Sequence, residues 1–270
     1  MSDLPPTDYS ALDKPEILHH IFYPRQEWRA PASPASRDIS IPVDRDIAIV
    51  ARFHHAERQS PTILFFHGNG EIVSDYDDLG PLYNRMGINF LVVDYRGYGS
   101  SGGSPSVSAM MSDCLAIYEF SRKWLTENGY TGPFMVMGRS LGSASALELA
   151  WRHPDVLDGL IIESGFAYAE PLLQLLGVDL RKVNLSLDKA FQNTEKIKAF
   201  HKPVLIIHAE FDHIIPFSDA RALYGASVSP DKTLLRIPGA NHNDIFLRGL
   251  TEYMAAVKSF SDRIRAGKAK

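Results

Sequence analysis

The sequence predicts an α/β protein with a mostly parallel sheet that is covered by helices on both faces. Short, continuous apolar segments rich in β-branched residues predict strands that are buried on both faces. These segments alternate with segments of helical period, and Gly, Pro, Asn or Asp residues stand at the boundaries. Because ligands of such sheets bind beyond the carboxyl ends of the strands, we expect the functional residues there.

The first elements along the chain are predicted at the edge of the sheet. Residues 1–37 contain six prolines, which disfavour long helices and predict an extended arm lying on the domain, without a role in chemistry. Residues 38–270 are predicted to form a single domain. It begins with two alternating apolar and polar segments, 38–43 and 46–55, which predict a half-exposed hairpin of edge strands.

The remaining elements follow as strand and helix in turn. Buried strands are predicted at 62–67, 89–94, 133–138, 159–164 and 203–208, and a further strand at 233–238. Helices are predicted at about 74–86, 107–127, 141–152, 217–226 and 243–263. Residues 166–200 interrupt this alternation with apolar clusters of their own, and we interpret this stretch as a helical insertion.

Composition and charge exclude several classes of function. The 270 residues are 45% hydrophobic and 22% charged, as in ordinary folded proteins, and the net charge of −4 makes nucleic acid an unexpected partner. The single cysteine, Cys114, excludes an intrachain disulfide and a multi-cysteine zinc site. The acidic N-terminal residues differ from a signal peptide, and no apolar run approaches the ~20 residues that span a bilayer. We therefore expect a cytoplasmic protein without a transmembrane segment.

A serine nucleophile is predicted by the pattern G-x-S-x-G, which occurs at 138–142 and at 99–103. The pattern carries chemistry only where a sharp turn from strand to helix exposes the hydroxyl, with glycines where side chains would collide. Ser140 has this setting, because it follows a predicted strand and precedes small residues that open a helix. Ser101 stands in a glycine-rich segment without helical character, and we interpret it as a loop residue.

A serine hydroxyl becomes a good nucleophile when an imidazole takes its proton. In folds built on a strand-turn-helix serine, the acid and then the histidine follow the nucleophile on loops beyond later strands. His242 has that position, between the last predicted strand and the final helix, whereas His208 and His213 are weaker substitutes.

The acid must accept a hydrogen bond from the second ring nitrogen of the histidine. Asp212 follows the predicted strand that ends at His208 and is the favoured candidate. Glu163 remains a rival because it ends the preceding strand, and Glu210, Asp219 and Asp244 rank lower.

Backbone N–H groups must bind the oxyanion that forms during acyl transfer. The glycine-flanked Asn69, in the segment 67–70 after a predicted strand, is expected to supply one N–H group. The N–H group of Leu141 is expected to supply the other. For His67 we favour a structural role in holding this loop over direct chemistry.

These segments together resemble the α/β-hydrolase superfamily. The resemblance rests on HGNGE at 67–71, DYRGYGSSGG at 94–103, GRSLG at 138–142 and the loops of Asp212 and His242. It covers about residues 40–262. More narrowly, the chain resembles the branch of serine aminopeptidase-like, prolyl-oligopeptidase-like and depalmitoylating thioesterase-like hydrolases, without a preference among them.

The resemblance implies an α/β-hydrolase fold, with a mostly parallel eight-stranded sheet and a short helical lid insertion. It also implies acyl-enzyme hydrolysis without a metal or organic cofactor, with Ser140, Asp212 and His242 as the triad.

We therefore expect a serine hydrolase that cleaves ester or thioester bonds of small acyl substrates. Phe166, Leu172 and Leu176 in the insertion are candidates for the acyl-binding pocket, although packing between helices explains them equally well. A peptidase of the same fold and a non-hydrolytic binding or interaction protein are the alternatives, and the complete triad argues against the latter. Nucleotide binding is excluded, because the glycine-rich segments lack the P-loop ending and the dinucleotide-binding spacing.

Overall fold

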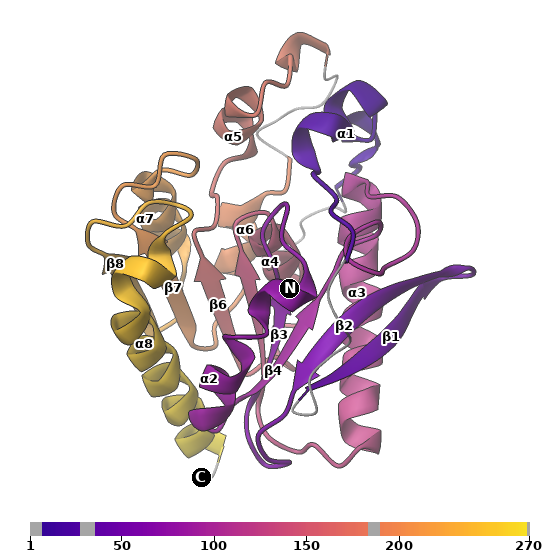
Figure 1. The fold of residues 1–270 in the computed structure, drawn as a ribbon. Coiled ribbons are helices and arrows are strands. Elements are labelled where there is room, and N and C mark those ends of the chain that lie inside the picture. Colours follow the sequence, from indigo (N-terminus) through magenta and orange to yellow (C-terminus); the bar gives the residue numbers. More distant parts are fainter. Residues whose placement is uncertain (1–6, 28–35, 183–189, 269–270) are drawn as a thin grey trace.

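An eight-stranded sheet runs through the molecule, in the strand order β1-β2-β4-β3-β5-β6-β7-β8 (Figure 1). The computed structural model describes residues 7–27, 36–182 and 190–268. The strands β3 to β8 pair in parallel, whereas β1 and β2 form an antiparallel hairpin that joins the sheet through β4. The strands are β1 (Ser36–Asp44), β2 (Ile47–His54), β3 (Thr62–Phe66), β4 (Asn89–Val93), β5 (Phe134–Arg139), β6 (Gly159–Glu163), β7 (Val204–Ala209) and β8 (Lys232–Ile237).

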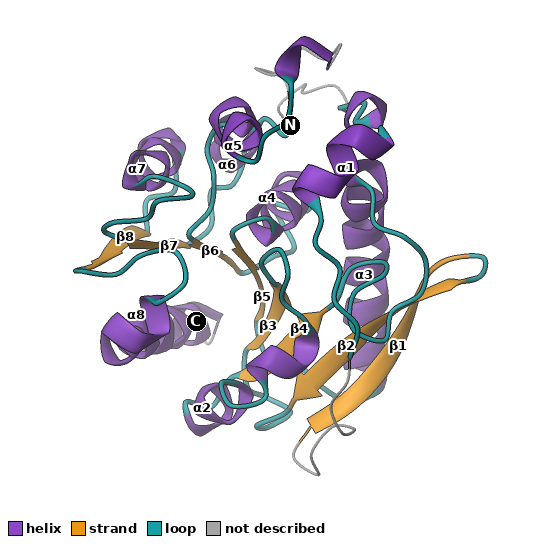
Figure 2. Cartoon of the chain, turned by 45° about the horizontal axis from the view of Figure 1, so that its top comes forward, coloured by secondary structure: helices purple, strands orange, loops and turns teal. Residues whose placement is uncertain are grey.

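Helices cover both faces of this sheet. Figure 2 shows α3, α4, α6 and α7 on one face and α2 and α8 on the other. The helices are η1 (Ser10–Leu12), α1 (Pro15–Ile21), η2 (Val73–Tyr76), α2 (Gly80–Arg85), α3 (Val107–Glu127), α4 (Gly142–Arg152), α5 (Ala169–Leu175), η3 (Leu180–Lys182), α6 (Asn193–Lys198), α7 (Phe217–Ala226) and α8 (Ile245–Lys268). The predicted eight-stranded, mostly parallel sheet with helices on both faces is thereby confirmed.

The continuous apolar strands supply two cores, one on each face of the sheet. Successive side chains of a strand point to opposite faces. In β3, Leu64 and Phe66 accordingly belong to the core beneath α3 and α4, whereas Ile63 and Phe65 belong to the core beneath α8. All four side chains are almost completely buried. A strand covered on both faces therefore needs apolar residues at every position.

Two predicted helices differ in detail from the structure. The expected helix at 74–86 is divided into η2 and α2, and Pro81 stands in the first turn of α2, where its missing N–H group is tolerated. The last helix, α8, is kinked at Gly249. A Cβ atom at this position would collide with Ile237 of β8, so the glycine lets the helix approach the sheet closely.

The prediction of an extended N-terminal arm is wrong for residues 10–12 and 15–21, which form η1 and α1. Pro15 occupies the first turn of α1, where proline favours helix formation. Ile17 and Ile21 are buried against the main core, and Asp13 accepts hydrogen bonds from the N–H groups of Val107 and Ser108 at the start of α3. The predictions for residues 1–6 and 28–35 lie outside the described residues.

The insertion at 166–200 is helical where the structure describes it, in α5, η3 and α6. Residues 183–189 lie outside the described part. In Figure 1, α5 and α1 stand at the same end of the molecule, so the insertion and the N-terminal segment face one another there. None of the described helices combines the length and apolar character needed to cross a membrane.

Candidate active site

Ser140 lies at the sharp turn between β5 and α4. Its backbone has φ of 51°, in the left-handed region that residues other than glycine rarely adopt. A Cβ atom at Gly138 would collide with the backbone of Gly142, and one at Gly142 would collide with the carbonyl oxygen of Phe66. Both glycines of the pattern are therefore required by the tight packing of β5, α4 and β3.

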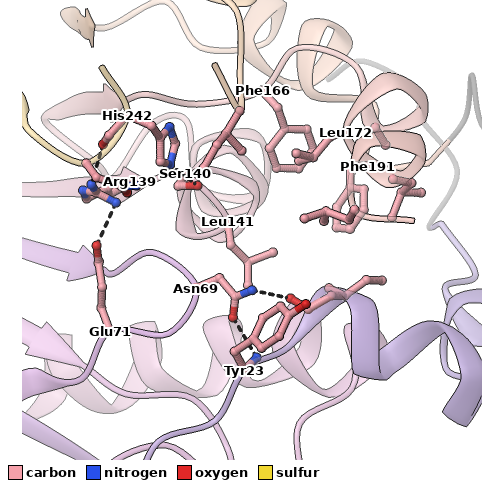
Figure 3. A pocket seen from close by; sticks show the side chains of 16 residues that line it. Tyr23, Asn69, Glu71, Arg139, Ser140, Leu141, Phe166, Leu172, Phe191 and His242 are labelled. Atoms are coloured by element: carbon pink, nitrogen blue, oxygen red, sulfur yellow. Dashed lines mark hydrogen bonds and ion pairs between the residues drawn. The ribbon is translucent and has the colours of Figure 1, made fainter. Parts of the chain in front are cut away.

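The structure brings Ser140, His242 and Asp212 together. The Nε2 atom of His242 lies 3.0 Å from the Oγ atom of Ser140, and its Nδ1 atom lies 2.7 Å from Oδ2 of Asp212. The loops after β5, β7 and β8 supply the three residues, as expected from the carboxyl ends of neighbouring parallel strands. Figure 3 shows the His242 ring beside Ser140 at one end of a pocket. This arrangement is suited to remove a proton from the serine hydroxyl.

The Asp212 carboxylate is held in its ionised form. Burial alone would raise the pKa of Asp212, but the hydrogen bond from His242 and the N–H groups of the loop lower it below its usual value. The N–H groups of Ile214 and Ile215 donate to Oδ1 at 3.0 and 2.8 Å, whereas Oδ2 lies 2.7 Å from the His242 ring and 3.4 Å from Nε2 of His208. The carboxylate can therefore stabilise a positive charge that forms on the His242 ring.

The rival acid and the substitute histidines have other surroundings. The Glu163 carboxylate accepts a hydrogen bond from the Tyr253 hydroxyl at 2.7 Å and pairs with Arg139, and burial raises its pKa. His208 is buried behind Asp212, where its Nε2 atom donates to the carbonyl oxygen of Ile215 at 2.8 Å. His213 is exposed to solvent. Within the described residues, none of these three side chains forms a hydrogen bond with Ser140.

Ser101 and His67 hold loops. The Ser101 hydroxyl accepts a hydrogen bond from the N–H group of Val50 at 2.8 Å, which ties its loop to β2. The His67 ring is completely buried, with its nitrogens 2.8 Å from the carbonyl oxygen of Gly68 and 3.2 Å from the Asp94 carboxylate. The structure thus gives both side chains structural contacts.

The loop that carries Asn69 is fastened by the N-terminal segment. The Asn69 side chain donates to the carbonyl oxygen of Ile21 at 2.7 Å and accepts from the N–H group of Tyr23 at 3.0 Å (Figure 3). It also accepts from the Tyr98 hydroxyl at 2.7 Å. Within the described part of the chain, neither the backbone N–H of Asn69 nor that of Leu141 has an acceptor. Both amides therefore remain available for an oxyanion.

A cavity of about 240 Å³ opens beside Ser140. Its polar end holds Ser140, His242, Asn69 and Glu71, and its opposite wall is apolar. The predicted pocket residues Phe166, Leu172 and Leu176 all line it. Sequence reasoning missed other parts of that wall, namely Ile21 and Tyr23 of the N-terminal segment and Phe191 of the insertion.

Sequence reasoning also missed an ionic cluster at the polar end of the cavity. Arg139 directly precedes Ser140 in the chain. Its guanidinium lies 2.7 Å from a carboxylate oxygen of Glu71 and 3.1 Å from a carboxylate oxygen of Glu163. The signal available in the sequence was a charged residue at the end of a buried strand, because a buried charge requires a partner. The described residues contain no cluster of His, Cys, Asp or Glu side chains suited to hold a metal ion.

Comparison with known proteins identifies the family. The family model for serine aminopeptidase, S33, matches residues 57–183. Alpha/beta hydrolase domain-containing protein 17B of Xenopus laevis is 34% identical over 206 residues, which are 74% of this chain and 65% of that protein. The human protein of the same name is 33% identical over 206 residues, which are 74% of this chain and 65% of the human protein. An uncharacterised protein of Mycobacterium tuberculosis is 28% identical over 231 residues, 84% of this chain and 79% of that protein.

Solved structures share the same fold. Est1E from Butyrivibrio proteoclasticus, with ferulic acid bound, has a TM-score of 0.72 at 21% identity and covers 84% of this chain and 99% of its own. The Pyrococcus furiosus esterase Pf2001 has a TM-score of 0.71 at 16% identity and covers 90% of this chain and 97% of its own. Together with the sheet order and the strand-turn-helix serine, these matches show the α/β-hydrolase fold. The chain belongs to the α/β-hydrolase superfamily, and it spans 65% of the length of the protein 17B relatives.

Proposed function

We propose that the protein is a serine hydrolase that cleaves carboxylic esters or thioesters through an acyl-enzyme intermediate on Ser140. The observation that carries this proposal is the hydrogen-bonded series of Ser140, His242 and Asp212 at the polar end of an apolar cavity. The names of the relatives agree with hydrolysis, and the nature of the bond cleaved is our inference from the site.

Each residue has a role that its contacts support. As the Ser140 oxygen attacks the carbonyl carbon, its proton passes to Nε2 of His242, and Asp212 stabilises the imidazolium through Nδ1. The N–H groups of Asn69 and Leu141 bind the negative oxygen of the tetrahedral intermediate. The imidazolium then protonates the leaving alcohol or thiol. Water hydrolyses the acyl-serine in a second round, with His242 again taking and returning the proton.

The cavity favours an apolar acyl group as the part of the substrate that is bound. Phe166, Leu172, Leu173, Leu176 and Phe191 converge on it from the insertion, and Ile21 closes it from the N-terminal segment. Each substrate methylene that is buried against this apolar wall contributes about 0.8 kcal/mol to the free energy of binding. We therefore propose that the insertion acts as a lid over a short to medium acyl chain.

Aminopeptidase activity is the second candidate, and the description of the matching family favours it. An aminopeptidase needs a negative group that receives the amino terminus of the substrate. Among the described lining residues, Glu71 is the one carboxylate, and its oxygens are occupied by Arg139, Tyr76 and the N–H group of Gly68. We therefore favour an ester or thioester over a peptide.

A hydrolysis panel tests this proposal. Acyl p-nitrophenyl esters, acyl-thioesters and aminoacyl p-nitroanilides are supplied to the protein and to the Ser140→Ala variant. We expect Ser140-dependent cleavage of esters and thioesters, with a kcat/KM that rises with chain length up to the capacity of the pocket. Cleavage of aminoacyl anilides in preference to esters would support the peptidase instead. Equal turnover by the protein and the Ser140→Ala variant would contradict serine catalysis.

A further inference from the structure

Arg139 contacts the three segments on which the proposed reaction depends. It directly precedes Ser140 in the chain, and its side chain is 7% exposed. One terminal nitrogen pairs with Glu71 of the Asn69 loop at 2.7 Å. The other donates a hydrogen bond to the backbone carbonyl oxygen of His242 at 2.9 Å. Figure 3 shows Arg139 between Glu71 and His242. One planar group, carried by the residue next to the nucleophile, therefore joins the proposed oxyanion loop to the loop of the base.

Glu71 links the Arg139 guanidinium to the oxyanion loop. One oxygen of its carboxylate pairs with Arg139, and the other accepts hydrogen bonds from the N–H group of Gly68 and from the Tyr76 hydroxyl, both at 2.6 Å. Asn69 lies between Gly68 and Glu71 in the chain. The carboxylate therefore closes a small ring of contacts around the residue whose N–H group is proposed to bind the oxyanion.

The Arg139 guanidinium is suited to fix the distance between the oxyanion loop and His242. It is planar and presents its donors in fixed directions, and it remains charged, so its contacts do not depend on protonation near neutral pH. Its two carboxylate partners compensate the charge in a buried position, where an unpaired charge would be costly. The hydrogen bond to the His242 carbonyl holds the backbone of the base itself and leaves its ring free for proton transfer.

We propose that Arg139 and Glu71 form a positioning pair that sets the distance between the oxyanion-binding loop and the catalytic histidine. This inference rests on the proposed function, because it concerns the geometry of that reaction. Neither side chain reacts in it. The pair acts through the N–H group of Asn69 and through the backbone of His242, and a displacement of either by about 1 Å is enough to cost turnover roughly 100-fold.

Glu163 provides a matched control, because it pairs with the same guanidinium from another direction. Its second oxygen accepts a hydrogen bond from Tyr253 of α8, and its side chain is completely buried. Its carboxylate has no hydrogen bond to the oxyanion loop within the described residues. Loss of the Glu163 charge should therefore weaken packing between β6 and α8, whereas loss of the Glu71 charge should disturb the reaction.

The test compares Glu71→Gln, Glu163→Gln, Arg139→Gln and Arg139→Lys with the unchanged protein and with Ser140→Ala. The measurements are kcat and KM for p-nitrophenyl butyrate and the thermal midpoint of unfolding. We expect Glu71→Gln to lower kcat by about 10- to 100-fold, with KM within about 3-fold because the apolar wall is intact. Glu163→Gln should lower the midpoint more than Glu71→Gln does and keep kcat within about 3-fold. Arg139→Lys should recover part of the kcat that Arg139→Gln loses.

The outcomes separate this inference from the proposed function. If the unchanged protein shows no hydrolysis that depends on Ser140, the proposed function fails. If that hydrolysis exists and Glu71→Gln keeps the full kcat, the positioning pair is refuted. The same conclusion follows if Glu71→Gln and Glu163→Gln lower kcat and the midpoint in parallel. Glu71 is partly exposed at the cavity, so its isosteric variant decides the question even if the Arg139 variants do not fold.

Discussion

At the scale of single residues, the backbone of Ser140 is held in a conformation that its side chain disfavours. Such conformations persist only where surrounding contacts enforce them. Here the N–H group of Ser140 donates to the carbonyl oxygen of Glu163 at 2.9 Å, and its own carbonyl oxygen accepts from the Ser143 hydroxyl at 2.6 Å. The strain keeps the hydroxyl clear of the sheet and within reach of His242.

The first prediction concerns the glycine that permits this turn. Gly142→Ala places a methyl group against the carbonyl oxygen of Phe66, so we expect a loss of about 1–3 kcal/mol in the free energy of unfolding, measured by denaturant titration. Gly225→Ala in α7 is the control, because the space around it is open and alanine favours the helix. Equal effects of the two substitutions would show that the packing around Gly142 tolerates a side chain.

The second prediction concerns the acid. Asp212→Asn should lower kcat by about 10⁴-fold, because the histidine loses its orienting acceptor and adopts the wrong tautomer. Glu163→Gln should retain most of the turnover, since its carboxylate pairs with Arg139 and Tyr253. Steady-state kinetics with a short-chain ester measure both. The opposite ranking would transfer the role of the acid to Glu163.

At the scale of elements, the insertion and the N-terminal segment build the cavity from two sides. The segment at 23–27 is tied to the loops beneath it, because Arg25 donates to the carbonyl oxygen of Gly70 at 3.2 Å and pairs with Asp75. The start of the insertion is tied as well, since the N–H group of Ala167 donates to Asp219 at 2.8 Å. These ties place apolar side chains opposite Ser140.

The third prediction separates substrate contact from packing in α5. Leu172 lines the cavity, whereas Leu175 of the same helix is 58% exposed and does not line it. Leu172→Asn should raise KM for longer acyl esters more than for acetyl esters, because each methylene loses part of its apolar contact. Leu175→Asn should leave the chain-length profile unchanged. A uniform loss across chain lengths in Leu172→Asn would indicate a packing role.

The sequence predicted what local patterns determine. The buried strands and the turn at Ser140 depend on neighbouring residues, so their positions agree with the structure closely. The helix at Pro15 was missed because proline breaks a helix in its interior but starts one at its first turn. The contacts of Arg139 and Asn69 join residues far apart in the chain, and no periodicity encodes them.

At the scale of the whole molecule, two buried histidines and one partly buried histidine make stability depend on pH. Burial lowers the pKa of His54, His153 and His208 below their ordinary value of 6.5. The folded state therefore binds fewer protons than the unfolded state just below pH 6.5, and stability falls as the pH decreases through this range. Asp212 remains ionised there, since its pKa is lowered from 3.8, so its contribution is lost only in stronger acid.

The fourth prediction follows from the lowered pKa values of these histidines. The thermal midpoint should be highest above pH 6.5 and should decrease between pH 6.5 and 5, by ~2–4 °C for each kcal/mol lost. His208→Gln keeps a donor for the carbonyl oxygen of Ile215 and removes one titrating group, so its midpoint should decrease less over the same range. Calorimetry at both pH values measures the difference. A decrease in the His208→Gln variant that equals or exceeds that of the unchanged protein would refute the assignment.

Covalent labelling of the serine tests the central claim most directly. The folded protein is treated with a fluorophosphonate, and the modified residue is mapped by peptide mass spectrometry. Among the described residues, only Ser140 combines the strained strand-to-helix turn with a hydrogen bond to the His242 ring. We therefore predict one adduct per chain, on Ser140. Ser140→Ala should abolish the adduct, and Ser101→Ala should leave it unchanged. An adduct on Ser101, or the absence of any adduct on a protein shown to be folded, would contradict the account.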